Sequence, residues 1–292
     1  MIQRIEEPRP DYMFLKFEGD GSISTMTEKT KNEKIREAVF RIFNLTFENR
    51  KRDGSLFQYF ETGGIAYLVK RGDEHLITLK GLYWLRERGY IQVKHFLHEM
   101  EKIGVKSKLL RMDIRRAYFA DRANEPLADL KKGFWIMKSS AESVYYPETI
   151  NRDFPDSSGA LFRSSQFDVN LYNKTRQLGV FEKRIKRLKT EDKKRRLQIA
   201  INRHKELYGD KEVFRFELKL KTPESASPFL SDILRKVDEA DFCYGVLEAF
   251  NASYPMKKGK QESKTYKLFF QRGIYEKKKQ RTSRSTKSTP KN

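Results

Sequence analysis

The sequence SSQFDVNLYNKTRQL, residues 164–178, contains a run in which every second residue is polar. The polar residues of this run are Asp168, Asn170, Tyr172 and Lys174. Successive side chains of a strand point to opposite faces, so these four groups share one face of an extended chain. Apolar residues alternate with them in the first part of the run and share the other face. The pattern predicts a strand with one polar face and one buried face.

Two other segments, LLRMDIRRAY (109–118) and VFRFELKLK (213–221), repeat this arrangement. Each places one carboxylate among cations on one face and apolar side chains on the reverse face. The polar positions are Arg111, Asp113 and Arg115 in the first segment, and Arg215, Glu217, Lys219 and Lys221 in the second. If the three strands are neighbours, Asp113, Asp168 and Glu217 converge on one open face.

The rest of the chain alternates irregularly between strand and helix patterns. Strands are predicted at 11–24, 56–61, 64–70, 75–80 and 133–140, and helices at 27–50, 82–105, 181–207 and 228–250. No regular βαβ rhythm is present, which favours an α+β fold. We expect a mostly antiparallel sheet with helices packed on one face and the polar face left open. The predicted parts are an N-terminal strand-turn-helix segment (1–63), a catalytic core (64–222), a C-terminal extension (223–276) and a disordered basic tail (277–292).

The charge of the chain predicts a polyanionic partner. The 292 residues include 61 Lys or Arg and 40 Asp or Glu, a net charge of +21. The tail at 277–292 carries seven of the basic residues and no acid, so the body retains +14. No stretch approaches about 20 apolar residues, so nucleic acid is favoured over a membrane. With a single cysteine, Cys243, and no apolar N-terminal segment, we expect a cytoplasmic protein.

The three carboxylates and the surrounding cations define a chemical hypothesis. Carboxylates at this density suit Mg²⁺ or Mn²⁺, and the cations suit phosphate. Tyr172 is placed to attack a phosphodiester, but a phenol is a weak nucleophile and needs a base, a metal or a nearby cation such as Lys174. The same alternation is also typical of a solvated strand face with ordinary cross-strand ion pairs. Periodicity alone does not establish that the three strands are adjacent.

At these residues the chain resembles the rolling-circle replication initiators of filamentous phages and of small plasmids. Three motifs occur in the same order: R-x-D at Arg111–Asp113, Y-x-K at Tyr172–Lys174, and R-F-E at Arg215–Glu217. The resemblance covers roughly residues 64–222. Each motif alone is weak, and their order makes the set more specific.

The resemblance implies a DNA-nicking enzyme of a bacterial host cell that acts with the host replication machinery. Its tyrosine attacks one strand at a replication origin, forms a 5′-phosphotyrosyl link and leaves a 3′-hydroxyl. Tyr172 and Lys174 are then the catalytic residues, and Asp113, Glu217 and Asp168 the candidate metal ligands. The candidate DNA-binding residues are Arg111, Arg115, Arg163, Arg215, Lys219 and Lys221.

Two departures from the family pattern keep other functions open. The family often has Glu five residues after the tyrosine, where this chain has Gln177. The paired histidines of other rolling-circle nucleases are absent from the sequence, and His95 and His98 are three residues apart in a predicted helix. A non-catalytic DNA-binding protein on the same scaffold, a repressor or packaging factor, is therefore the alternative. An RNA-binding protein of the translation apparatus fits the charge but not the motif order.

Overall fold

A computed structural model describes twelve segments of the chain, the longest of them 87–120 and 159–209. The others are 2–18, 26–45, 54–59, 63–70, 74–82, 136–137, 143–145, 211–235, 238–254 and 256–257. The predicted basic tail, 277–292, lies outside the described residues, as do most of the predicted strand at 133–140 and the end of the C-terminal extension.

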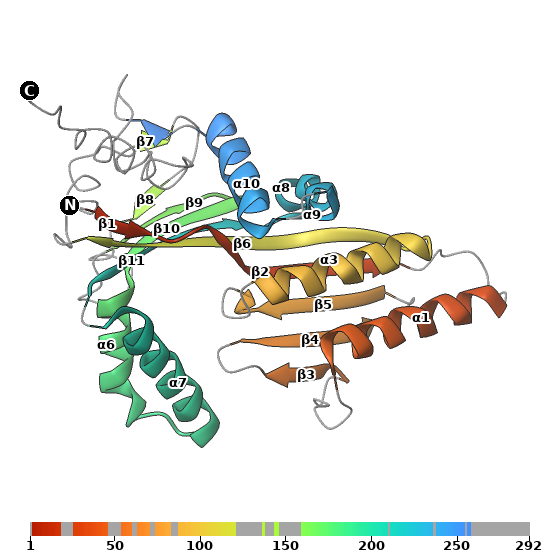
Figure 1. The fold of residues 1–292 in the computed structure, drawn as a ribbon, viewed down its shortest axis with the longest axis horizontal. Coiled ribbons are helices and arrows are strands. Elements are labelled where there is room, and N and C mark those ends of the chain that lie inside the picture. Colours follow the sequence, from red (N-terminus) through yellow and green to blue (C-terminus); the bar gives the residue numbers. More distant parts are fainter. Residues whose placement is uncertain are drawn as a thin grey trace, which may run out of the picture.

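A single antiparallel sheet of ten strands organises the described chain (Figure 1). Its order is β3-β4-β5-β2-β6-β11-β10-β9-β8, and β1 pairs with the end of β6. The strands are β1 (Ile2–Ile5), β2 (Arg9–Glu18), β3 (Leu56–Tyr59), β4 (Gly64–Lys70), β5 (Glu74–Lys80), β6 (Lys106–Ala120), β8 (Ser143–Tyr145), β9 (Gly159–Arg163), β10 (Phe167–Asn173) and β11 (Val213–Leu220). Two short strands, β7 (Ile136–Met137) and β12 (Met256–Lys257), pair separately. The predicted α+β class is confirmed.

Most of the helices that the structure describes pack on the apolar face of the sheet. These are α1 (Met26–Phe43), α3 (Glu87–Lys102), α8 (Pro223–Ala226), α9 (Leu230–Arg235) and α10 (Glu239–Ser253). The buried faces of β2, β6 and β11 join these helices in one hydrophobic cluster. Gly89 lies in the first turn of α3 and does not interrupt it.

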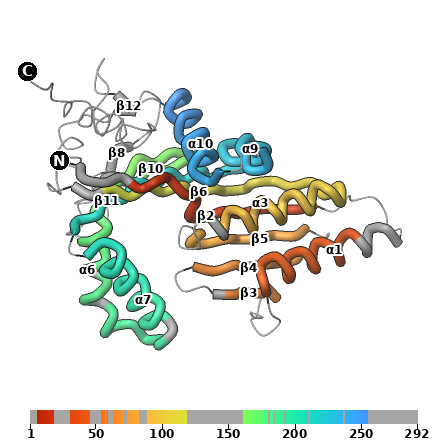
Figure 2. Tube along the Cα trace, in the orientation of Figure 1, coloured from red at the N-terminus to blue at the C-terminus, as the bar shows by residue number. Residues whose placement is uncertain are grey.

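Two further described helices, α6 (Lys174–Ile185) and α7 (Glu191–Tyr208), form a hairpin on the other face. Tyr208 of α7 packs with Ala117 and Val213, two residues on the polar face of β6 and β11. The hairpin projects away from one end of the sheet, as the tube in Figure 2 shows. The prediction of one helix at 181–207 is therefore wrong: the chain folds back before α7, where Thr190 adopts an extended backbone.

Two other boundaries also differ from the sequence-based prediction. Two α-helices stand in the predicted range 228–250: α9 ends at Arg235 and α10 begins at Glu239. Asp238 caps α10 by accepting a hydrogen bond from the Asp241 N–H at 3.0 Å. Lys174 begins α6 instead of ending the preceding strand. Asn173 caps that helix through the Arg176 N–H at 3.0 Å, which turns the chain immediately after Tyr172.

Replacing Phe216 with alanine tests the central position of β11. Its side chain is fully buried, so we expect the free energy of unfolding to fall by about 3–5 kcal/mol. Urea unfolding followed by circular dichroism measures the change. Ile91→Ala, at a position 57% exposed, is the control and should change stability by no more than about 0.5 kcal/mol. Equal losses in both variants would contradict the central role of β11.

Candidate active site

The three strands with alternating charge are adjacent in the sheet. β11 lies between β6 and β10 and pairs antiparallel with both. The condition on which the sequence-based interpretation depends is therefore met. The side chains of β10 alternate regularly between buried and half-buried, as the sequence pattern predicts.

The register of these strands sets which polar groups meet. Tyr172 lies opposite Arg215, and Glu217 lies opposite Asn170 on one side and Arg115 on the other. Residues that pair across antiparallel strands project from the same face. Tyr172, Arg215 and Glu217 therefore meet at the end of the polar face from which α6 departs.

Tyr172 contacts both a carboxylate and a guanidinium. Its hydroxyl donates a hydrogen bond to Glu217 Oε1 at 2.6 Å and accepts one from Arg215 Nη1 at 3.3 Å. Arg215 Nη1 also lies 3.7 Å from Glu217 Oε1. The phenol is thus held between an acceptor for its proton and a cation that stabilises a negative oxygen.

The electrostatics of this pair keep the proton on the phenol at rest. Burial raises the pKa of Tyr172 well above that of free tyrosine, and the positive charge of Arg215 offsets only part of this effect. Burial also raises the pKa of Glu217, but the charges of Arg215 and Lys219 outweigh it and hold that pKa below the ordinary value. Glu217 is therefore ionised at neutral pH and available as a proton acceptor.

Lys174 lies near the phenol although it belongs to a helix. Its Nζ is 5.9 Å from the centre of the Tyr172 ring and donates a hydrogen bond to Gln177 Oε1 at 2.6 Å. Burial lowers the pKa of Lys174 well below the ordinary value, and the charge of Arg215 lowers it further. Gln177, at the position where the resembled family often has Glu, thus binds the lysine without neutralising it.

A second buried arginine extends the site towards β2. Arg115 is 2% exposed and donates a hydrogen bond from Nη1 to Asp11 Oδ1 at 3.4 Å. Burial lowers its pKa to about 10, and repulsion from Arg215 contributes to the same shift. The two guanidinium groups therefore share one electrostatic environment.

Helix α7 contributes a residue that the sequence analysis missed. His204 is buried, and its Nε2 lies 3.1 Å from Thr175 Oγ1. The Thr175 hydroxyl also accepts the Val213 N–H at 3.0 Å, which links α6, α7 and β11. The sequence does contain a signal for its burial: Ile201, His204 and Tyr208 are three and four residues apart and therefore share one face of a helix.

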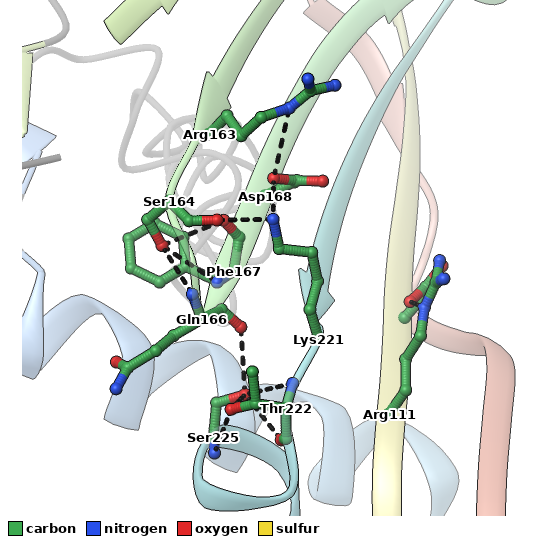
Figure 3. Close-up of polar contacts among 10 residues, drawn as sticks. Arg111, Arg163, Ser164, Gln166, Phe167, Asp168, Lys221, Thr222 and Ser225 are labelled. Atoms are coloured by element: carbon green, nitrogen blue, oxygen red, sulfur yellow. Dashed lines mark hydrogen bonds and ion pairs between the residues drawn. The ribbon is translucent and has the colours of Figure 1, made fainter. Parts of the chain in front are cut away.

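The three predicted metal ligands are each held by cations. Arg111 donates two hydrogen bonds to Asp113, from Nε at 2.9 Å and from Nη2 at 2.8 Å. Lys221 Nζ donates to Asp168 Oδ1 at 2.8 Å, while Arg163 approaches the same oxygen at 3.9 Å (Figure 3). Glu217 contacts the phenol and Arg215, and Lys219 Nζ lies 3.7 Å from its Oε2.

This arrangement does not fit a metal site formed by the described residues. Asp113 and Asp168 face the same residue, Lys219, from opposite sides, so their Cα atoms are about 10 Å apart. Among the residues that the structure describes, no three His, Cys, Asp or Glu side chains gather closely enough to hold an ion. His95 and His98 lie on α3 and pair with Glu99 and Glu101.

The sequence matches no protein-family profile, and no curated protein is detectably similar to it. Solved structures do resemble the fold. A rolling circle replication initiator protein from Geobacillus stearothermophilus superposes with a TM-score of 0.53 at 14% identity, over 90% of this chain and 91% of that one. Methanococcus jannaschii TBP aligns at 14% identity over 79% of this chain and 96% of that one, with a TM-score of 0.28 that supports no conclusion. The first likeness establishes a shared fold.

None of the helices that the structure describes is long and apolar enough to cross a bilayer.

The environment of His204 predicts a pH-dependent stability. Burial lowers its pKa to about 4, and the charges of Arg215, Lys174 and Arg115 add to the shift. The unfolded chain has a pKa near 6.5, so only the unfolded state takes up this proton as pH falls from about 6.5 to about 4. His204 therefore does not change the free energy of unfolding above about pH 6.5. As pH falls from about 6.5 to about 4, it lowers that free energy by up to about 3 kcal/mol.

Replacing His204 with glutamine should remove this contribution, because the amide keeps a hydrogen-bonding group near Thr175 and does not titrate. Urea unfolding at a series of pH values measures it: the variant should lose less stability than wild type between about pH 6.5 and 4. His95→Gln, at a side chain 57% exposed, should follow wild type. Parallel losses in wild type and His204→Gln would contradict the assignment.

Proposed function

We propose that this protein is a DNA-nicking initiator of rolling-circle replication of a phage or plasmid. The observation that carries the proposal is the short hydrogen bond from Tyr172 to Glu217, with Arg215 at the same phenolic oxygen. The fold shared with a replication initiator supports it. The working environment would be the cytoplasm of a bacterial host, where host polymerase extends the new 3′ end.

The reaction is a transesterification at phosphorus. The Tyr172 oxygen attacks the phosphate of one DNA strand while its proton passes to the Glu217 carboxylate. The bond from phosphorus to the 3′-oxygen breaks, and that oxygen leaves as a hydroxyl once it gains a proton. The product is a 5′-phosphotyrosyl link, which preserves the ester for later resealing.

A divalent ion, Mg²⁺ or Mn²⁺, remains a prediction of the sequence. Binding one at Asp113 or Asp168 would require Arg111 or Lys221 to release its carboxylate. No step of the proposed reaction is therefore assigned to a metal.

Cations on the open face and on the hairpin would hold the DNA backbone. Arg111 on β6, Arg163 on β9, Lys219 on β11 and Lys221 just after β11 lie around Asp113 and Asp168, further along the polar face from Tyr172. From Glu182 to Glu206 the chain has 11 Lys or Arg and four Asp or Glu, a net charge of +7 on an element that projects from the sheet. At the tip of the hairpin a hollow of about 610 Å³ is lined partly by Lys186, Lys194 and Arg195.

Replacing Tyr172 with phenylalanine should abolish covalent attachment to DNA, because the attacking oxygen is lost. The assay incubates the protein with supercoiled and single-stranded DNA of its own replicon, with and without Mn²⁺, and resolves the products on a denaturing gel. Tyr254→Phe removes a hydroxyl from the end of α10 and should leave adduct formation unchanged. If Tyr172→Phe still forms the adduct, Tyr172 is not the nucleophile.

Replacing Glu217 with glutamine should slow adduct formation by about 10²–10⁴-fold, because the amide cannot accept the proton. Glu212→Gln, at a partly exposed residue just before β11, is the matched control and should stay near wild type. Equal rates for Glu217→Gln and wild type would exclude Glu217 as the base.

Neutralising the hairpin tip should make DNA binding less dependent on salt. In the triple variant Lys186→Gln, Lys194→Gln and Arg195→Gln, the slope of log K against log salt should decrease by about 0.7–0.9 for each DNA phosphate that the protein no longer neutralises. The control carries the same charge change on the helices of the apolar face: Lys34→Gln, Arg41→Gln and Lys102→Gln. Identical slopes in the two triple variants would show that the hairpin does not contact the DNA backbone.

The second candidate is a non-catalytic DNA-binding protein, a repressor or packaging factor. It is favoured by Gln177, because the family pattern has a carboxylate at this position and here an amide accepts the hydrogen bond from Lys174. Such a protein would show the salt-dependent binding described above and would form no adduct under any metal condition.

A further inference from the structure

Three cationic side chains from three elements of the fold lie in the neighbourhood of Tyr172. Arg215 on β11 contacts the oxygen directly, Lys174 begins α6, and Arg115 lies on β6 opposite Glu217. We call Arg115, Lys174 and Arg215 the cationic cluster. Arg115 is 2% and Arg215 6% exposed, so both charges lie in a region where electrostatic interactions are stronger than at the surface.

Positive charge exceeds negative charge in this region. The acids that face the cluster are Asp11, bound to Arg115, and Glu217, bound to Tyr172 and Arg215. Lys219 also contacts Glu217 but lies opposite Asp113 and Asp168, so it is not counted, and the three cations of the cluster face two acids when all are ionised. The mutual repulsion is visible in the pKa values of Lys174 and Arg115, which burial and neighbouring arginines both lower. An arriving anion would relieve this repulsion.

Arg215 retains a donor for such an anion. Its buried Nε has no hydrogen-bond partner in the structure, and its Nη1 is already within hydrogen-bonding distance of the attacking oxygen. A phosphorus atom bonded to that oxygen carries its other oxygens within reach of the same guanidinium. Because Tyr172 and Lys174 are half-buried, a phosphate can approach them from solvent.

We propose that the cationic cluster is the subsite for the phosphate that Tyr172 attacks, and that these side chains neutralise its charge in place of a divalent metal. The proposal rests on the nicking function above and specifies how that site binds its substrate. The carboxylates that would otherwise hold a metal are occupied by Arg111 and Lys221.

The cluster also completes the proton balance of the reaction. The phenolic proton passes to Glu217, which becomes neutral and no longer repels the phosphate. The departing 3′-oxygen takes a proton from the Lys174 ammonium, which becomes an amine. One proton is therefore accepted and one donated as the phosphorus–oxygen bond to Tyr172 forms and the bond to the 3′-oxygen breaks.

The first test uses wild-type protein and single-stranded DNA of its replicon after exhaustive treatment with a chelator. The proposal predicts that the covalent adduct forms in chelator at a rate within about tenfold of that in Mn²⁺, since side chains supply the charge. An adduct that forms only after Mn²⁺ or Mg²⁺ is restored would overturn the proposal and leave the nicking function intact.

The second test measures binding of inorganic phosphate in chelator, without DNA, by titration calorimetry. Arg215→Gln and Lys174→Gln should each weaken phosphate binding by about tenfold or more, because each removes a charged donor. Lys108→Gln removes a cation from the same strand as Arg115, seven residues away, and should bind phosphate within about twofold of wild type. Circular dichroism of each variant verifies folding, and Lys174, being half-buried, is the substitution less disruptive to it.

The two tests separate the two claims. If no adduct forms under any condition, the nicking function fails, and phosphate binding alone decides whether the cluster is an anion site. Equal phosphate affinities in wild type, Arg215→Gln and Lys174→Gln would then overturn the subsite as well.

Discussion

The antiparallel register that places β11 between β6 and β10 is the constraint on which the candidate site depends. It sets Tyr172 opposite Arg215 and Glu217 opposite Arg115 on one face of the sheet. The reverse faces of the same strands supply the hydrophobic core beneath α3 and α10. Because side chains alternate with a period of two, a slip of one residue would bury the charges and expose the core. Packing of the apolar face therefore fixes the geometry of the polar one.

The polar face in turn concentrates charge at the end covered by α7. Burying Arg115 and Arg215 near Lys174 costs stability, which Asp11 and Glu217 offset only in part. Such an arrangement is expected where a site must receive an anion, because binding relieves the repulsion among the cations. Burial lowers the pKa of His204, and the same cations lower it further, so His204 is neutral.

The sequence was sufficient for those parts of the fold that depend on local periodicity. The alternation in 164–178 and 213–221 predicts β10 and β11 and their polar faces, and the apolar spacing predicts the helices. It could not reveal that the helix at 181–207 folds back on itself, because its charges and thin apolar stripe continue across the turn. Nor could it place His204 beside Thr175, since that contact joins distant segments. The start of α6 at Lys174 depends on the local Asn173 cap, which the continuing polar alternation concealed. The carboxylates were predicted to meet at a metal, but neighbouring cations bind them.

The central claim is that the strand register presents Tyr172 as the nucleophile. Its most direct test is mass spectrometry of tryptic peptides from the protein after reaction with DNA of its replicon and nuclease digestion. The account predicts a nucleotide attached to the peptide that contains Tyr172. A nucleotide attached to a different tyrosine would contradict it, as would full reaction of the DNA with no modified peptide.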